Sequence, residues 1–215
     1  MTRLAIFDVD GTLLDSLGVI HDCLRVACQG ADTVPPSRKD VGRRVGLSFP
    51  QMVADLFPDQ PRRKTDEIIA RYRICFVGKA GEATLYPGVA DGLMRLRRTG
   101  FQLGLATGKS QRSVERMIAM NGWEKMFSTL QCADHHPSKP HPAMIQTALR
   151  QTGFAADEAI MIGDTTYDVA TARAADVDCI GVTWGYHDAH SLKEAGAVAL
   201  FDDFASLTQH LESLA

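Results

Sequence analysis

The chain has 215 residues, of which 45% are hydrophobic and 23% are charged, a composition typical of a soluble globular protein. Its formal net charge of −3 gives no basic excess, which argues against a nucleic-acid-binding protein. No apolar run approaches the roughly 20 residues of a membrane span, and early acidic residues argue against a signal peptide. With five cysteines and no C-x-x-C pair, we expect free thiols in a cytoplasmic protein that contacts no membrane.

Short apolar runs recur along the chain and lack clean alternation, as strands that are buried on both faces do. They predict strands at 4–7, 101–106, 128–133, 159–163, 178–184 and 197–201. Amphipathic patterns between them predict helices at about 88–99, 110–121, 141–152, 165–175 and 203–214. This alternation of strand and helix predicts an α/β fold with a doubly wound, mainly parallel sheet.

The stretch from about 16 to 80 breaks the alternation, because helical patterns follow one another there without a strand. Ser37 with Asp40 has the form of a helix start, and proline-containing segments separate the patterns. Since about 65 residues exceed an ordinary crossover between strands, we expect an inserted all-helical cap domain at 16–80. Residues 1–15 and 81–215 would then form a Rossmann-like core. A helical flank of that same core is the alternative.

Acidic residues follow two of the expected strands. Asp8 comes directly after the first apolar run, Asp10 stands two positions later, and Asp164 follows the run at 159–163. Sites in open α/β sheets lie at the carboxyl ends of strands, so these acids converge if the two strands are neighbours. Carboxylates together with phosphate oxygens are ligands for hard cations such as Mg²⁺. The alternatives are an ordinary turn after Asp8 and a helix N-cap at Asp164.

The segment GLATGKS at 104–110 is similar to a phosphate-binding P-loop, but its first glycine stands one position too late. Thr107 and the backbone N–H of Gly108 instead follow a strand and open a helix, which predicts a different kind of anion site. Lys139 precedes a helix start, where the helix dipole disfavours a cation, so it is better placed facing an anion. An exposed loop lysine is the alternative for Lys139, and we expect Lys109 at the surface.

Together these segments resemble the four motifs of the haloacid dehalogenase superfamily of phosphohydrolases. The matches, in chain order, are DVDGT at 8–12, Thr107 in LATGK, Lys139 in SKPHP and GDTTYD at 163–168. The resemblance covers the whole chain. The expected insertion resembles the helical cap of the subgroup that includes phosphoglycolate phosphatase, pyrophosphatases and β-phosphoglucomutase, and the segments GVTWGY and SLKEAGA resemble the phosphoglycolate phosphatase branch.

The resemblance implies a Mg²⁺-dependent hydrolase of phosphate monoesters. Asp8 would be the nucleophile that forms an aspartyl-phosphate, and Asp10 would protonate the leaving oxygen and then activate water. Mg²⁺ would bind the Asp8 carboxylate, the backbone carbonyl of Asp10, and Asp164. The acid at position 10 favours phosphate esters over halides, because a halide leaving group needs no proton.

The resemblance also implies a phosphate site made of Thr107, Gly108 and Lys139, with Asp168 orienting the lysine. We expect the substrate to be a small phosphorylated metabolite, best matched by phosphoglycolate, and the protein to be a monomer or homodimer. Arg43 and Arg44 in the cap would either reach an anionic tail of the substrate or stay solvated. Alternatives are a pyrophosphatase, a phosphomutase of this fold, or a catalytically lapsed protein that binds phosphorylated ligands.

Overall fold

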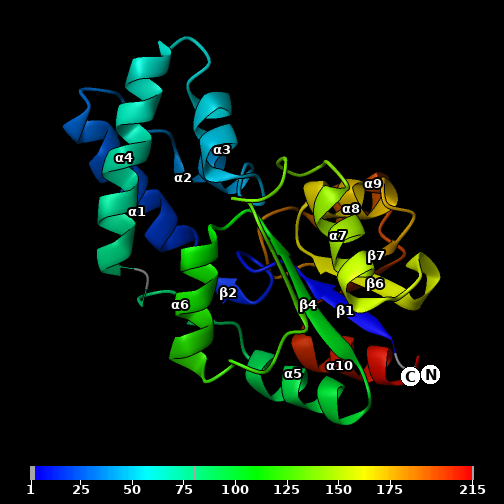
Figure 1. The fold of residues 1–215 in the computed structure, drawn as a ribbon. Coiled ribbons are helices and arrows are strands. Elements are labelled where there is room, and N and C mark those ends of the chain that lie inside the picture. The colour runs from blue at the N-terminus through cyan, green and yellow to red at the C-terminus, as the bar shows by residue number, and fades with distance from the viewer. Residues whose placement is uncertain (1–2, 80, 215) are drawn as a thin grey trace.

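A parallel six-stranded sheet with strand order β5-β4-β1-β6-β7-β8 forms the centre of the computed structural model, which describes residues 3–79 and 81–214 (Figure 1). The strands are β1 (Leu4–Phe7), β4 (Gln102–Thr107), β5 (Thr129–Cys132), β6 (Ala159–Gly163), β7 (Asp178–Val182) and β8 (Ala199–Phe201). The chain builds outward from β1 in both directions, so the strand order reverses between β1 and β6. Ligands of such sheets bind at the carboxyl ends of the strands beside this point.

Helices cover both faces of the sheet, which confirms the predicted doubly wound α/β fold. One face carries α5 (Val89–Arg98), α6 (Gln111–Asn121) and α10 (Phe204–Glu212), and the other carries α7 (Ala143–Thr152), α8 (Thr166–Arg173) and α9 (Ala189–Ala195). Alternate residues of β1 enter the two layers: Ala5 and Phe7 face the first, Leu4 and Ile6 the second. A short 3₁₀ turn, η1 (Ala156–Glu158), leads into β6.

A second group of helices packs around its own apolar cluster, apart from the sheet (Figure 1). It comprises α1 (Leu17–Gly30), α2 (Arg38–Gly42), α3 (Phe49–Leu56) and α4 (Arg62–Lys79). A short antiparallel pair, β2 (Leu14–Asp15) with β3 (Thr84–Leu85), joins the two ends of this segment to the rest of the chain. Neither this pair nor α9 (Ala189–Ala195) was among the elements expected from the sequence. The division at 16–80 stays a prediction.

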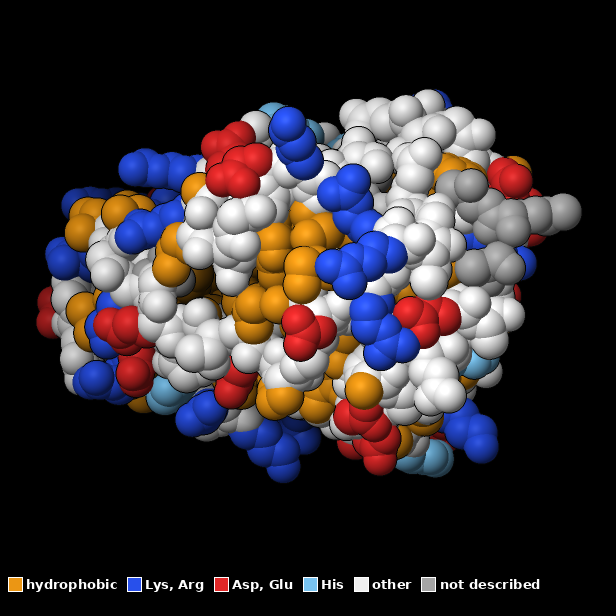
Figure 2. Space-filling model, turned by 90° about the horizontal axis from the view of Figure 1, so that it is seen from below, with side chains coloured by type: hydrophobic (Ala, Val, Ile, Leu, Met, Phe, Trp, Pro, Cys, Tyr) orange, Lys and Arg blue, Asp and Glu red, His pale blue; other side chains and the backbone are white. Residues whose placement is uncertain are grey.

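The surface on one side of the molecule combines exposed hydrophobic side chains with a run of Lys and Arg side chains (Figure 2). The arginines of the last turns of α5, where cations suit the helix dipole, are exposed. Arg95 pairs with Glu212 of α10, and Arg97 donates to the carbonyl of Lys125.

No helix in the described part of the chain is long and apolar enough to cross a membrane.

Candidate active site

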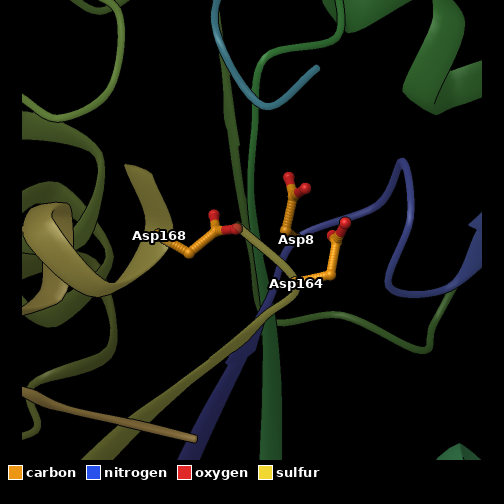
Figure 3. A group of neighbouring side chains, drawn as sticks. All are labelled: Asp8, Asp164 and Asp168. Carbon is orange, nitrogen blue, oxygen red and sulfur yellow. The ribbon is translucent and has the colours of Figure 1, made fainter. Parts of the chain in front are cut away.

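Three buried carboxylates meet at the carboxyl ends of β1 and β6 (Figure 3). Parallel pairing of these strands brings the backbone N–H of Asp8 2.9 Å from the carbonyl oxygen of Ile162. Oxygen atoms of Asp8, Asp164 and Asp168 all lie within 4.8 Å of one another. Asp168 comes from the first turn of α8 and Asp164 from the end of β6 (Figure 3). The convergence that the two strand ends suggested is therefore present in the structure.

The Asp164 carboxylate is oriented by donors from two other segments. The hydroxyl of Thr12 donates to Oδ1 at 2.9 Å, and the backbone N–H of Tyr186 donates to Oδ2 at 2.9 Å. Gly11, at φ +90°, leaves room for it, because a Cβ there would stand 2.2 Å from Oδ2 of Asp164. The N-cap alternative for Asp164 is wrong, since the hydroxyl of Thr165 accepts the N–H bond of α8 instead.

Lys139 is fully buried between two of these acids, so the exposed-loop alternative for this residue is wrong. Its Nζ lies 2.9 Å from Oδ1 of Asp8 and 2.5 Å from Oδ1 of Asp168. The other oxygen of Asp168 accepts the backbone N–H and the hydroxyl of Thr165, at 3.0 and 2.7 Å. Burial lowers the pKa of Lys139, but Asp168 and Asp8 outweigh it and raise the pKa above its usual value.

The charges of this cluster do not balance among the side chains that meet there. Burial raises the pKa of Asp8 to about 7, against the lowering by Lys139, and it raises the pKa of Asp164 well above its usual value, with Asp168 and Asp8 adding to the shift. Within the described structure, the buried Oδ2 of Asp8 accepts no hydrogen bond. A buried, unpartnered oxygen beside other carboxylates fits a divalent cation with oxygen ligands.

The carboxylate of Asp10 is bonded to Lys109 and Ser16, which do not contact the other three acids. Its Oδ1 lies 2.6 Å from Nζ of Lys109 and also accepts a very short hydrogen bond from the hydroxyl of Ser16. Lys109 is only 9% exposed, so the expectation of a surface lysine is wrong. Sequence reasoning missed both partners: Lys109 stood inside the P-loop-like segment, but its role depends on where the Asp10 side chain lies.

Thr107 ends β4 and is fully buried, and its hydroxyl accepts the backbone N–H of Lys109 at 3.2 Å. Gly108 is in close contact with the helical group, because a Cβ there would stand 2.3 Å from the carbonyl oxygen of Leu47. The backbone of Ser48 donates to the hydroxyl of Ser138 at 2.8 Å. The helical group therefore rests directly on the loops at the ends of the strands.

A cavity of about 460 Å³ lies between the two groups of elements. Asp8, Asp10, Thr107 and Gly108 line one wall. The opposite wall is largely apolar and comes from the helical group, with Leu47, Phe49, Met52, Tyr72 and Phe76. Four of the predicted site residues thus share one cavity, and Lys139, Asp164 and Asp168 are buried beside it.

Arg43 and Arg44, for which a substrate contact and a solvated position were both left open, lie outside the lining of this cavity. Arg44 donates to the backbone carbonyl of Asp40 at 3.0 Å, and Arg43 is an exposed residue 3.9 Å from the carboxylate of Asp40. Both arginines therefore contact Asp40 of the helical group.

The sequence model of the haloacid dehalogenase-like hydrolase family matches residues 5–182, so the chain belongs to this family. It is 32% identical to a "Probable phosphatase IndB" of Dickeya dadantii (96% of this chain, 92% of that one). It is also 32% identical to a phosphoglycolate phosphatase of Rhodospirillum rubrum (96% and 90%). A solved structure described as a predicted phosphatase from Clostridium acetobutylicum superposes with a TM-score of 0.89 at 26% identity, covering 98% of both chains. The predicted family and phosphatase class are confirmed.

Proposed function

We propose that this protein is a Mg²⁺-dependent phosphomonoester hydrolase that forms an aspartyl-phosphate on Asp8. The observation that carries the proposal is the convergence of the buried Asp8, Asp164 and Asp168, with Lys139 bonded to the first and the last and one Asp8 oxygen unpartnered. A carboxylate oxygen that accepts no hydrogen bond is suited to bond to another group. Asp8 itself lines a cavity large enough for a small metabolite.

In the first chemical step, a carboxylate oxygen of Asp8 attacks the phosphorus atom and the bond to the leaving oxygen breaks. Asp10, which lines the same cavity wall, donates a proton to that leaving oxygen. Asp10 then takes a proton from a water molecule that attacks the phosphorus of the aspartyl-phosphate, which releases phosphate and restores Asp8.

Charge on the phosphoryl oxygens is neutralised by this chain's own donors and by the metal. The hydroxyl of Thr107, the backbone N–H of Gly108 and the Lys139 ammonium would bind these oxygens, and Asp168 holds the lysine in place. Mg²⁺ held by Asp8, the backbone carbonyl of Asp10 and Asp164 would supply further positive charge to the phosphoryl group.

We infer that 16–80 is a cap domain and that 1–15 with 81–215 is the catalytic core. The separate apolar cluster of α1–α4 supports this division, as does the short β2–β3 pair at its base. Movement about residues near 15–18 and 79–85 would admit the substrate, and closure would exclude bulk water from the aspartyl-phosphate. The contact of Leu47 with Gly108 supports closure of this kind.

The substrate that fits best is a small phosphorylated metabolite like phosphoglycolate, which the name of the Rhodospirillum relative supports. The five cysteines are free thiols, which supports a cytoplasmic setting. The protein would act there as a monomer or homodimer. Pyrophosphate hydrolysis and sugar-phosphate mutase activity are the competing reactions of the same site.

Initial rates with phosphoglycolate, pyrophosphate, hexose and pentose phosphates and nucleoside monophosphates test the proposal. We expect Mg²⁺-dependent phosphate release that is fastest with phosphoglycolate and is lost in Asp8→Asn. Conversion of β-glucose 1-phosphate to the 6-phosphate without free phosphate would identify a mutase. Binding without turnover of any substrate would identify a catalytically lapsed protein.

A further inference from the structure

One buried cation stands in the cavity on the side of the proposed acid–base residue. Lys109 is 9% exposed, and its Nζ lies 2.6 Å from Oδ1 of Asp10. The same ammonium lies 5.2 Å from the centre of the Phe76 ring, which belongs to α4 on the opposite wall. Lys109 thus lies between Asp10 on one wall and Phe76 on the other, and it lines the cavity.

The other cations near the cavity are placed differently. Arg73, Arg112 and Arg116 line it but are exposed, and Arg116 donates to the backbone carbonyl of Val77 at 2.6 Å. Lys139 is already bonded to two carboxylates beside the nucleophile. Among the described residues that line the cavity, Lys109 is therefore the buried cation available to the part of a substrate that leaves.

We propose that Lys109 is a specificity-determining residue that binds a carboxylate on the leaving group, so that the preferred substrates are phosphate esters of short hydroxy acids. This inference rests on the proposed function. Asp10 must touch the ester oxygen in order to protonate it. In a phosphorylated hydroxy acid the carboxylate lies one methylene beyond that oxygen, and the Lys109 ammonium sits directly beside Asp10.

The surroundings of Lys109 allow it to serve both acids. A lysine ammonium has three N–H donors, and Asp10 takes one of them in this structure. Asp10 also accepts a hydrogen bond from Ser16, so it keeps a partner when a second carboxylate shares the ammonium. The apolar side chains of Leu47, Tyr72 and Phe76 line the facing wall and lower the local dielectric, which strengthens a charge–charge contact there.

The test compares two esters that differ only in the group beyond the ester oxygen: phosphoglycolate and 2-hydroxyethyl phosphate, its neutral analogue. The quantity measured is the ratio of their kcat/KM values with Mg²⁺. We expect wild type to favour phosphoglycolate by roughly 10- to 100-fold, the range for a hydrogen bond to a charged group. Lys109→Met keeps the apolar stem and removes the ammonium. We expect it to lower kcat/KM for both esters, because Asp10 loses its partner, and to bring the ratio of the two values close to one.

Arg112→Met is the matched control, because Arg112 is a cation of the same cavity that stays exposed. It should leave the ratio unchanged, and Lys109→Arg, which retains the charge, should preserve part of it. An equal loss for both esters in Lys109→Met would overturn the inference and leave Lys109 as a partner of Asp10 alone. A wild-type enzyme without preference for phosphoglycolate would overturn it while the proposed function stands. Phosphate release from neither ester, but from another phosphate ester of the panel, would overturn the inference alone, and release from no substrate of the panel would overturn both.

Discussion

Removing the charge of Asp8 is expected to stabilise the metal-free protein, and also to abolish turnover. Burial, partly opposed by Lys139, raises the pKa of Asp8 from an ordinary value of 3.8 to about 7. One pKa unit corresponds to about 1.36 kcal/mol, so the difference between 7 and 3.8 gives a cost of about 4 kcal/mol when Asp8 is ionised in the folded state.

The sign follows from proton binding. Between pH 3.8 and about 7 the folded protein keeps a proton on Asp8 that the unfolded chain has lost, so stability falls as the pH rises through this window. The cost is absent below the window and complete above it. Asp8→Asn, which resembles the protonated acid, should therefore be more stable than wild type at pH 8 by up to about 4 kcal/mol. This advantage should shrink as the pH falls.

Urea unfolding in the presence of a chelator, at several pH values between 4 and about 8, measures this difference. Asp59→Asn, a change at an exposed acid between α3 and α4, is the control and should behave as wild type. Identical midpoints for wild type and Asp8→Asn at the alkaline end would refute the reasoning, as would an offset that does not change with pH. Added Mg²⁺ should stabilise wild type more than Asp8→Asn, because the proposed metal site of the folded state includes this carboxylate.

Three further substitutions test the packing of the site. Gly11→Ala would place a Cβ 2.2 Å from the Asp164 carboxylate at a φ of +90°; steady-state assays should show turnover reduced about 100-fold or more. Gly108→Ala would place a Cβ 2.3 Å from the carbonyl of Leu47, so thermal unfolding should show a loss of about 1–3 kcal/mol and KM should rise. Asp168→Asn removes the charge that holds the buried lysine, so kcat should fall about 10- to 100-fold without loss of the fold by circular dichroism.

The sequence predicted those parts of the site that depend on local structure and sheet order. Asp8 and Asp164 each follow a buried strand, and parallel pairing of β1 with β6 suffices to bring them together. Asp168 lies one turn into a helix whose start is marked by Thr165, so its direction follows from the helix itself. The strand positions were predictable because the strands from β1 to β7 of the sheet are short runs of largely buried residues, and only β8 is half-buried throughout.

The features that escaped prediction depend on contacts between distant segments. Lys109 is buried because Asp10 and Phe76 meet it from two sides, and no pattern within residues 104–110 carries that information. For Arg43 and Arg44 the sequence left open a substrate contact or a solvated position, and only the structure shows their contacts with Asp40. The β2–β3 pair and α9 are too short to give a periodic signal.

Tyr186 ties the start of α1 to a carboxylate of the site. Its backbone N–H holds Asp164, while its hydroxyl oxygen accepts the N–H groups of Ser16 and Leu17, at 3.2 and 3.1 Å. Tyr186 therefore connects the two groups of elements. Its backbone binds Asp164 in the site, and its side chain binds the backbone at the start of α1. If the proposed cap moves, a rotation of α1 that breaks the hydroxyl contacts would leave Asp164 undisturbed, whereas one that keeps them would also shift the backbone that binds Asp164.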